Sequence, residues 1–451
     1  MSDYLNTRNP ILPLKIHVPD SEAHVMPDGK LYVYGSFDDK DDEFCSDKYH
    51  VVSTPDMMHW TVHPVSMKGA DVPWSNDPNA VKYQGIDWMH PTPFIRKMIQ
   101  GMDFGEGRKQ REAENEIPKA PMLFAPDAAC KNGKYYLYFC MSDDSEGVAV
   151  SEKPEGPFTS PVQLPCGGID PAVFIDNDGR AYYYWGQLFA HGVELNPDMM
   201  SFEEDKAVDN LVTEYDHFFH EGSSVRRIGD TYYFVYADME RGKPTALGYA
   251  TGMSPLGPFT YQGIIIDNDG CDPASWNNHG SIECVDGQWY VFYHRCSRGS
   301  QQHRRLCIEK ININPDGTID EVKMTSQGVG EPFVPGEKIM GYQACGLKGN
   351  VRIDVDASYE EALTCILDGD EAVFRYVQNE KAWTKAYFQL SGSGKIEIYM
   401  DGELAGMTVA ENMDEKYHSC AAQIQMEAGV RELKLKFSHV RNLKIAEIVL
   451  E

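Results

Sequence analysis

Apolar and aromatic residues crowd into five short segments, each of which follows a turn dipeptide. Such dipeptides favour tight hairpin turns, and runs rich in Tyr, Phe, Trp and Val are typical of β-strands. Each segment is therefore predicted to be a turn that enters a strand. The segments are DGKLYVYG at 28–35, NGKYYLYF at 132–139, DGRAYYYW at 178–185, GDTYYFVY at 229–236 and DGQWYVFY at 286–293.

The five segments recur at a nearly regular spacing. Aligned on Tyr32, Tyr136, Tyr182, Tyr233 and Tyr290, they lie about 50 residues apart, except for a first step of about twice that length, which indicates an insertion. A further strand and a turn rich in Pro and Gly follow each segment. This repeat length matches a four-stranded blade. An all-β fold with a five-bladed β-propeller over residues 1–330 is predicted, and a sandwich built from the same hairpins is the alternative.

The repeat stops at a connector that contains Pro and Gly, GEPFVPGEKIMGYQACG, around residues 330–345. Beyond it, alternating segments such as AYFQLSGSGKIEIYMDGE and LKIAEIVLE indicate short antiparallel strands. Residues 340–451 are therefore predicted to form a C-terminal β-sandwich, an accessory domain like a carbohydrate-binding module. A purely structural role, in which it braces the propeller, fits the sequence equally well.

Composition and charge narrow the choice of partners and compartment. The chain has 451 residues and a formal net charge of −28, which disfavours nucleic acid and anionic membranes as partners. The first residues lack the pattern of a secretory signal, and the 11 cysteines contain no C-x-x-C pair. A cytoplasmic protein with reduced thiols and a neutral substrate is expected. No Gly-rich loop follows a strand and opens a helix, so no organic cofactor is predicted.

Three acidic residues stand just before or inside strands that precede the repeat strands. They are Asp20 in VPDSEAHV, Asp170 in GGIDPAVF and Glu221 in FFHEGSSV. The innermost strands of a propeller converge on a central channel, so these carboxyls can meet there although they are far apart in sequence. One protonated carboxyl and one carboxylate that activates water are what inverting glycoside hydrolysis requires.

The same segments resemble glycoside hydrolase family 43. The likeness covers about residues 9–312 and includes NPILPLKIHVPDSEAHVMPDGKLYVYGS, FAPDAACKNGKYYLYF, GGIDPAVFIDNDGRAYYYWG and FFHEGSSVRRIGDTYYFVYA. The resemblance implies that Asp20 is the general base, Glu221 the general acid, and Asp170 the residue that orients the acid and raises its pKa. It also implies a calcium ion in the channel beside His279 of WNNHGSIE.

Four further residues are assigned to substrate binding. By resemblance, Phe37 and Phe124 are subsite aromatics, although the family more often carries Trp at the position of Phe124, and Arg304 reaches the sugar hydroxyls. Asp127 either binds substrate or holds its blade. Aromatic faces and charged donors are the groups that bind sugars, but each of these residues also has an ordinary packing role as its alternative.

The predicted function is the exo-acting, inverting release of terminal α-L-arabinofuranose and/or β-D-xylose from short hemicellulose-derived oligosaccharides. Endo-arabinanase, galactanase and fructosidase specificities remain open, and a fructosidase would retain configuration with more closely spaced carboxyls. A phosphorylase and a non-catalytic carbohydrate-binding protein are further alternatives. Turnover of an aryl glycoside would exclude the last of these.

Overall fold

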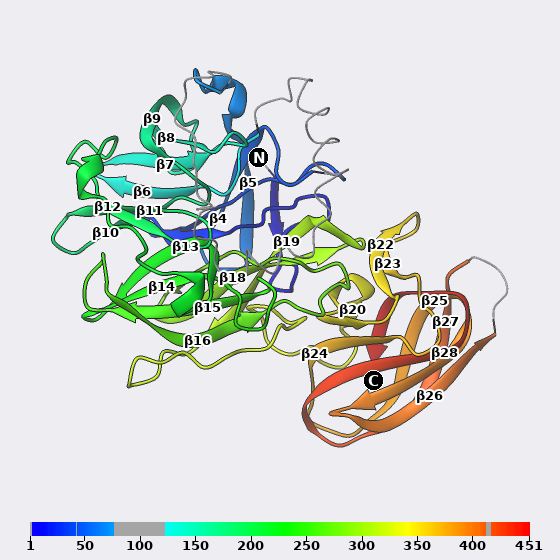
Figure 1. The fold of residues 1–451 in the computed structure, drawn as a ribbon. Helices are drawn as coiled ribbons and strands as arrows, with labels where there is room; N and C mark the ends of the chain where they lie inside the picture. The colour runs from blue at the N-terminus through cyan, green and yellow to red at the C-terminus, as the bar shows by residue number, and fades with distance from the viewer. Residues whose placement is uncertain (1, 42, 76–121, 412–415) are drawn as a thin grey trace, which may run out of the picture.

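The computed structural model describes residues 2–41, 43–75, 122–411 and 416–451. A ring of five small sheets is followed by a larger strand-rich domain beside it (Figure 1). The insertion predicted between the first two repeats falls mainly at 76–121, outside the described residues. The predicted all-β class, with a five-bladed propeller and a C-terminal sandwich, is confirmed.

Each blade is an antiparallel sheet, and the first also contains the N-terminal strand β1 at its outer edge, paired with β5. The first blade contains β1 (Ser2–Leu5), β2 (Glu22–Val25), β3 (Leu31–Tyr34), β4 (Lys48–Thr54) and β5 (His59–Lys68). The second contains β6 (Asp127–Lys131), β7 (Lys134–Cys140), β8 (Ser145–Ser151) and β9 (Thr159–Gly167). The third contains β10 (Ala172–Ile175), β11 (Ala181–Trp185) and β12 (His191–Glu194). The fourth contains β13 (Phe219–Ile228), β14 (Thr231–Asp238), β15 (Ala246–Gly252) and β16 (Phe259–Asp267). The fifth contains β17 (Ser281–Val285), β18 (Gln288–Ser297) and β19 (Ser300–Ile311).

The five aromatic segments form the second strand from the channel in their blades, namely β3, β7, β11, β14 and β18. Both faces of these strands are buried because each blade packs between two others. Tyr138 of β7 and Tyr183 of β11, for example, place their ring centroids 5.2 Å apart between adjacent blades. Burial on both faces explains why the segments read as nearly continuous apolar runs.

The ring closes between the first and last blades. The innermost strands β2, β6, β10, β13 and β17 are neighbours in that order, and β17 lies next to β2. The Ser281 hydroxyl donates to the Ser21 carbonyl at 2.8 Å, and the Ala23 N–H donates to the Ser281 oxygen at 3.1 Å. Further out, the Asn9 amide exchanges hydrogen bonds with the backbone of Ile308 in β19. Side chains therefore supply much of the closure.

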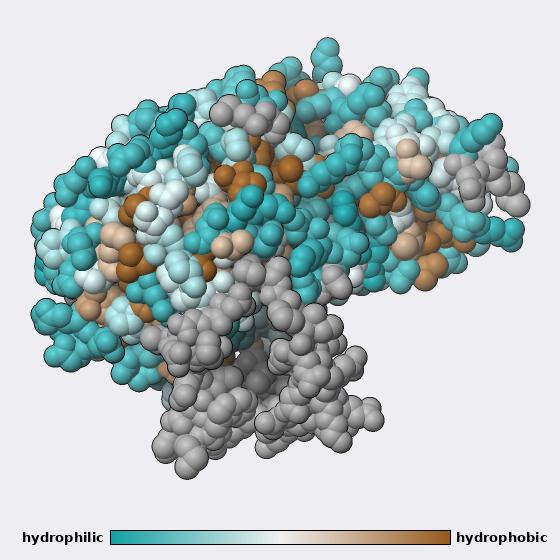
Figure 2. Space-filling view, turned by 90° about the horizontal axis from the view of Figure 1, so that it is seen from above, coloured by the Kyte–Doolittle hydropathy of each residue, from teal (hydrophilic) through white to brown (hydrophobic). Residues whose placement is uncertain are grey.

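Helical structure is limited to single turns within the described residues. These are η1 (Gly69–Asp71), η2 (Glu204–Lys206), α3 (Glu214–His217) and η3 (Gly341–Gln343). None is long and apolar enough to cross a membrane. On the face shown in Figure 2, hydrophilic residues predominate and apolar ones are scattered in small groups.

The C-terminal domain is a nine-stranded antiparallel sheet folded over one apolar core. Its strands are β20 (Lys338–Met340), β21 (Gly346–Lys348), β22 (Arg352–Asp356), β23 (Glu360–Thr364), β24 (Glu371–Asn379), β25 (Trp383–Met400), β26 (Glu403–Glu411), β27 (His418–Met426) and β28 (Gly429–Leu450). The long strands β25 and β28 pair along most of their length, with three register shifts. Fully buried Phe374, Phe388 and Phe437 pack in the core.

The sandwich packs against the last blade through backbone and charged contacts. The Arg298 N–H, in the turn between β18 and β19, donates to the Ile353 carbonyl at 2.8 Å. The Leu347 N–H donates to the Gly270 carbonyl at 2.6 Å. The propeller strands end at Ile311 and the sandwich strands begin at Lys338, and we retain 1–330 and 340–451 as the proposed domain limits.

The second blade contains a buried acidic side chain, Glu146 of β8. Its Oε2 atom accepts hydrogen bonds from the Tyr183 hydroxyl and from the Cys166 thiol. Its Oε1 atom is buried and has no partner in the part of the chain that the structure describes. Burial raises the pKa of Glu146 to about 8, because the charged form is poorly solvated there. Folding therefore favours the protonated carboxyl.

This carboxyl predicts a pH-dependent stability. The contribution of Glu146 is fully present below pH 4.5 and is lost as pH rises toward 8, at up to about 1.4 kcal/mol per pH unit. We expect the melting temperature of Glu146→Gln to fall less over this range than that of the wild type, as measured by thermal unfolding in matched buffers. Glu152→Gln, at an exposed site nearby, should follow the wild type. Parallel curves for all three proteins would contradict the prediction.

Candidate active site

The channel opens into a pocket of about 340 Å³ at the end where the inner strands begin. Six of the eight residues singled out from the sequence line it. They are Asp20, Phe124, Asp170, Glu221, His279 and Arg304. Phe37 and Asp127 do not belong to the lining. The volume is at the lower end of the range of about 300 to 1,000 Å³ that is usual for small-ligand pockets.

Asp20 and Asp170 occupy equivalent positions in their blades. Each lies two residues before an inner strand, β2 or β10, and each has a φ of 55°. Asp tolerates this left-handed conformation better than most residues. The sharp local turn positions each carboxyl at the mouth of the channel, where both are at least nine-tenths buried.

Glu221 reaches the pocket from an irregular part of β13. The register between β13 and β14 shifts on both sides of Glu221, which is the pattern of a β-bulge. Gly222 follows with a φ of 77°, and a Cβ atom there would lie 2.8 Å from Cδ2 of His279. Glycine is required here both for the conformation and for the approach of the His279 ring.

The Asp20 carboxylate is surrounded by groups that stabilise its charge. It accepts hydrogen bonds from the Ser36 hydroxyl at 2.6 Å and from Nη1 of Arg304 at 2.8 Å. The rings of His279 and His294 lie 3.9 and 3.6 Å away. Burial alone would raise the pKa of Asp20, but its charged and hydrogen-bonding neighbours, Arg304 first, outweigh burial and hold that pKa below its usual value.

Arg304 is held in place by a second carboxylate, Asp38. The Nε and Nη2 atoms of Arg304 donate to the two oxygens of Asp38, each at 2.9 Å. The Cys45 N–H also donates to Asp38. Asp38 and Arg304 are both buried, so their charges are balanced inside the protein. Nothing in the sequence distinguished Asp38 from its acidic neighbours.

Asp170 differs from Asp20 in its charge environment. Burial, and then the nearby charge of Glu221, raise the pKa of Asp170 well above its usual value. Two carboxyls that repel each other in a buried site favour a state in which they hold one proton between them. The pocket therefore combines Asp20, whose pKa is lowered, with Asp170, whose pKa is raised.

Two polar side chains from the third and fourth blades contact Glu221. The Gln187 amide donates to its Oε2 atom at 2.8 Å, and Nε2 of His220 lies 3.8 Å from the same oxygen. Both residues line the pocket. No sequence pattern distinguishes them, because Gln187 lies in the loop after β11 and His220 could equally be a core residue.

Burial disfavours the charged form of both histidines beside Asp20. Burial lowers the pKa of His279, and burial together with the charge of Arg304 lowers the pKa of His294 to about 3. The Nδ1 atom of His279 lies 3.6 Å from Asp170, so its ring stands between the carboxyls of two blades. His294 was not predicted, and it lies within β18.

The aromatic walls differ in part from those expected. Phe124 lines the pocket, but Phe37 packs in the apolar cluster shared by the first and last blades, and its ring centroid is 4.6 Å from that of His50. The aromatic residue that the first blade contributes is Phe44. Trp276, which is 45% exposed, lies at the rim and offers a face on which a sugar ring can stack.

Asp127 lies one layer deeper in the channel. It pairs with Tyr138, and Glu22 pairs with Tyr34, a tyrosine at the same position of the repeat. Asp127 is thus equivalent to Glu22, two residues further along the inner strand than Asp20. Side chains two apart in a strand point the same way. Both carboxyls therefore face the channel below the pocket.

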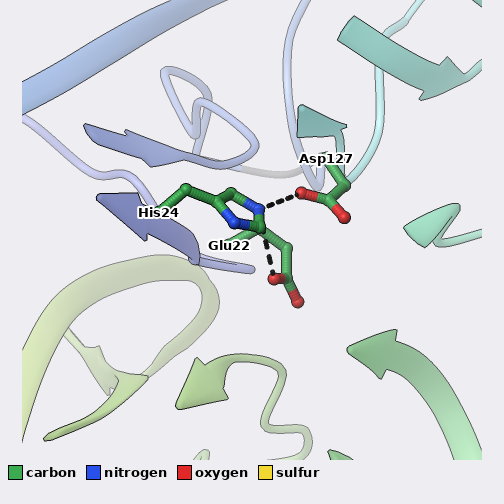
Figure 3. Close-up of side chains that lie close together, drawn as sticks. All are labelled: Glu22, His24 and Asp127. Atoms are coloured by element: carbon green, nitrogen blue, oxygen red, sulfur yellow. Dashed lines mark hydrogen bonds and ion pairs between the residues drawn. The ribbon is translucent and has the colours of Figure 1, made fainter. Parts of the chain in front are cut away.

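Glu22, His24 and Asp127 form a compact group that could hold a metal ion (Figure 3). Nε2 of His24 is 2.6 Å from Asp127 and 4.0 Å from Glu22. Glu22 is buried, and its Oε1 atom has no hydrogen-bond partner among the described residues. Burial and the charge of Asp127 raise the pKa of Glu22 well above its usual value, although Arg226 offsets part of the effect. A divalent cation would suit these groups, and His279 is not among them.

The solved structures that this protein resembles include enzymes of glycoside hydrolase family 43. One is a family 43 β-xylosidase/α-arabinofuranosidase from a compost metagenome, in complex with xylotriose and in a calcium-free form. It is 28% identical, with a TM-score of 0.55 over 71% of this chain and 99% of the other. A family 43 enzyme from Xanthomonas citri is 27% identical, with a TM-score of 0.54 over 70% and 93%.

Sequence comparison gives the same result. The profile of Glycosyl hydrolases family 43 matches residues 105–319. A xylosidase/arabinosidase of Bacteroides ovatus is 31% identical over 67% of this chain and 94% of its own length. The chain belongs to glycoside hydrolase family 43. Another xylosidase/arabinosidase, from Thermoclostridium stercorarium, is 29% identical over 95% of this chain and 85% of its own length, so this likeness extends beyond the propeller.

Membership of family 43 confirms both the family that the sequence segments resemble and the class of enzyme that was predicted. The protein is a glycoside hydrolase. The non-catalytic alternative is therefore set aside, since the pocket also retains all three carboxyls that the family resemblance implied.

The buried contact between Asp38 and Arg304 gives a testable prediction for this family 43 enzyme. Asp38→Asn leaves Arg304 short of one charge partner, and breaking a buried pair typically costs about 3–5 kcal/mol. We expect a melting temperature several degrees lower and a fall in kcat/KM, because Arg304 also holds Asp20. Thermal unfolding and steady-state kinetics test both effects.

Asp39→Asn is the matched control. Asp39 pairs with Lys48 at the surface, where both side chains are about 30% exposed, so its loss should cost no more than about 1 kcal/mol. Equal changes in the two variants would show that the Asp38 contact has no special importance.

Proposed function

We propose that this enzyme releases terminal α-L-arabinofuranose and/or β-D-xylose with inversion, using Asp20 as general base, Glu221 as general acid and Asp170 as the residue that keeps a proton available to Glu221. The observation that carries the proposal is the difference in charge environment within one pocket. Asp20 is held ionised by Arg304, whereas Asp170 is pushed toward its protonated form beside Glu221.

The reaction follows from these two states. Asp20 accepts a proton from a water molecule as that water attacks the anomeric carbon of the sugar. Glu221 donates a proton to the glycosidic oxygen as its bond to that carbon breaks. Attack on the face opposite the leaving group inverts the configuration. The proton taken up at Asp20 is later returned to Glu221 through solvent, which restores both groups.

The shape of the pocket supports action at a chain end. Its deep side is formed by buried Asp20, Arg304 and His279, whereas Trp276 lies exposed at the rim. A terminal sugar can therefore enter first, with the rest of the oligosaccharide extending past Trp276. Arg304, which has a fixed orientation, is suited to bind hydroxyls of that terminal sugar, and Phe124 to pack against its ring.

The choice of pentose rests on relatives. The relatives from Bacteroides ovatus and Thermoclostridium stercorarium carry the name xylosidase/arabinosidase, and a Bacillus subtilis relative that is 27% identical is an arabinoxylan arabinofuranohydrolase. We extend both activities to this chain, with short pentose-containing oligosaccharides as substrates.

Hydrolysis of 4-nitrophenyl α-L-arabinofuranoside, 4-nitrophenyl β-D-xyloside and xylobiose tests the proposal. We expect Asp20→Ala to lower kcat by about 10²- to 10⁴-fold on all active substrates, since no base remains to activate water. Glu221→Ala should lose more activity on xylobiose than on the aryl glycosides, because 4-nitrophenol leaves without much help from an acid. Asp178→Ala, at an exposed turn, is the control.

Several results would contradict the proposal. Equal losses of Glu221→Ala on good and poor leaving groups would argue against its role as the acid. Retention of anomeric configuration, followed by NMR, would exclude the inverting mechanism. A wild type inert on all three substrates would exclude the pentose assignment.

We also propose that a calcium ion binds in the channel, with Glu22 and Asp127 as oxygen ligands and His24 beside them. The buried, unpartnered oxygen of Glu22 supports this, because calcium prefers oxygen ligands and would balance the two carboxylates. Bound there, the ion would neutralise acidic charge below the pocket. The role of His279 would then be confined to the pocket layer.

Calcium binding can be measured without activity. After treatment with EDTA, the wild type should melt at a higher temperature when millimolar calcium is added, since a ligand at 100 times its Kd stabilises by about 2.7 kcal/mol. Glu22→Gln should abolish that shift, whereas Glu283→Gln, a carboxylate bound by Arg226 outside the group, should keep it. The same shift in all three proteins would place the ion elsewhere.

A further inference from the structure

Two consecutive arginines of β19 point to different parts of the molecule. Side chains of adjacent residues in a strand face opposite sides. Arg304 extends into the pocket, where it contacts Asp20 and Asp38. Arg305 extends the other way and contacts Glu361 of β23 in the sandwich. One strand therefore links the pocket to the second domain.

Glu361 binds the hairpin of β18 and β19 at two points. Both of its carboxylate oxygens accept hydrogen bonds from Nη2 of Arg305. Its Oε1 atom also accepts from Nε and Nη2 of Arg298, at 3.1 and 3.0 Å, in the turn of the hairpin. Glu361 is 1% exposed, and within the described part of the chain Arg305 has no other ion-pair partner.

Loss of this carboxylate would leave two arginines without their countercharge. Arg305 is buried, and its Nε and Nη1 atoms already lack partners within residues 2–41, 43–75, 122–411 and 416–451, so its side chain could reach water only if the hairpin moved. Arg304 is the next residue along the same backbone. A displacement that frees Arg305 therefore changes the position of the Arg304 guanidinium against Asp20.

We propose that Glu361 is a positioning residue, which holds the β18–β19 hairpin so that Arg304 keeps its place in the pocket. The sandwich thereby helps to position a residue of the pocket, whether or not it binds carbohydrate. This inference rests on the proposed role of Arg304 in substrate binding.

The first experiment compares Glu361→Gln with Glu337→Gln. Glu337 forms a half-buried ion pair with Arg8 of the propeller, 2.6 Å long, and its hydrogen bonds among the described residues go to Arg8 and Val334 rather than to β19. It is therefore a control for loss of a contact between the propeller and the C-terminal region. Both variants should have a lower melting temperature than the wild type. Well below those transitions, only Glu361→Gln should raise KM, by about tenfold, with a smaller change in kcat. An unchanged KM in folded Glu361→Gln would overturn the proposal.

Glu361→Asp covers the case in which Glu361→Gln fails to fold. It keeps the charge on a side chain one methylene shorter, and we expect a KM between those of the wild type and Glu361→Gln. A wild-type KM in folded Glu361→Asp would also overturn the proposal.

A double-mutant cycle shows whether Glu361 acts through Arg304. In an Arg304→Lys background, Glu361→Gln should change kcat/KM by less than about twofold, because the group that it positions is already altered. A full, additive loss would indicate a merely structural role. If Asp20→Ala remained active, the proposed function itself would fail. If Asp20→Ala lost its activity while the Glu361 variants kept the KM of the wild type, only the role of Glu361 would be overturned.

Discussion

The contact of Arg304 with Asp20 and Asp38 joins the last blade to the first at the floor of the pocket. A propeller has no central core, so its ring must be closed by contacts between its first and last blades. Here a buried guanidinium contributes to that closure and also fixes the charge of the proposed base. Its two carboxylates balance a cation that would otherwise be costly to bury. Stability of the ring and the electrostatics of the site therefore depend on the same three side chains.

The period of two along the inner strands explains how one channel contains chemically different layers. The first layer contains Asp20 and Asp170, the second Glu22 and Asp127, and the third includes Arg226, which lines a separate pocket at the other end. Each layer is two residues below the last on the same strands. Acidic groups in adjacent layers repel one another, and the arginine in the third layer offsets part of that repulsion for Glu22. A cation in the second layer would complete this balance.

Local patterns predicted the blades and the proposed catalytic residues, because both depend on short segments that repeat. The depth of Asp127 could also have been read from the repeat, since its register matches that of Glu22 rather than that of Asp20. That Phe44 rather than Phe37 lines the pocket could not be predicted, because the loop between β3 and β4, which has no fixed period, decides which ring reaches the pocket. No sequence pattern indicated a role for Glu361. Its partner lies 56 residues away in sequence and in another domain.

Acid–base hydrolysis needs two carboxyls of similar intrinsic acidity to hold different protonation states at one pH. Burial alone cannot do this, since it raises the pKa of every carboxyl in the pocket. The difference arises from unequal partners: Asp20 has a guanidinium, whereas Asp170 has another carboxyl. Because that guanidinium comes from the fifth blade and Asp20 from the first, the separation exists only when the ring is closed. A propeller opened between its first and last blades would keep all three carboxyls and lose the difference between them.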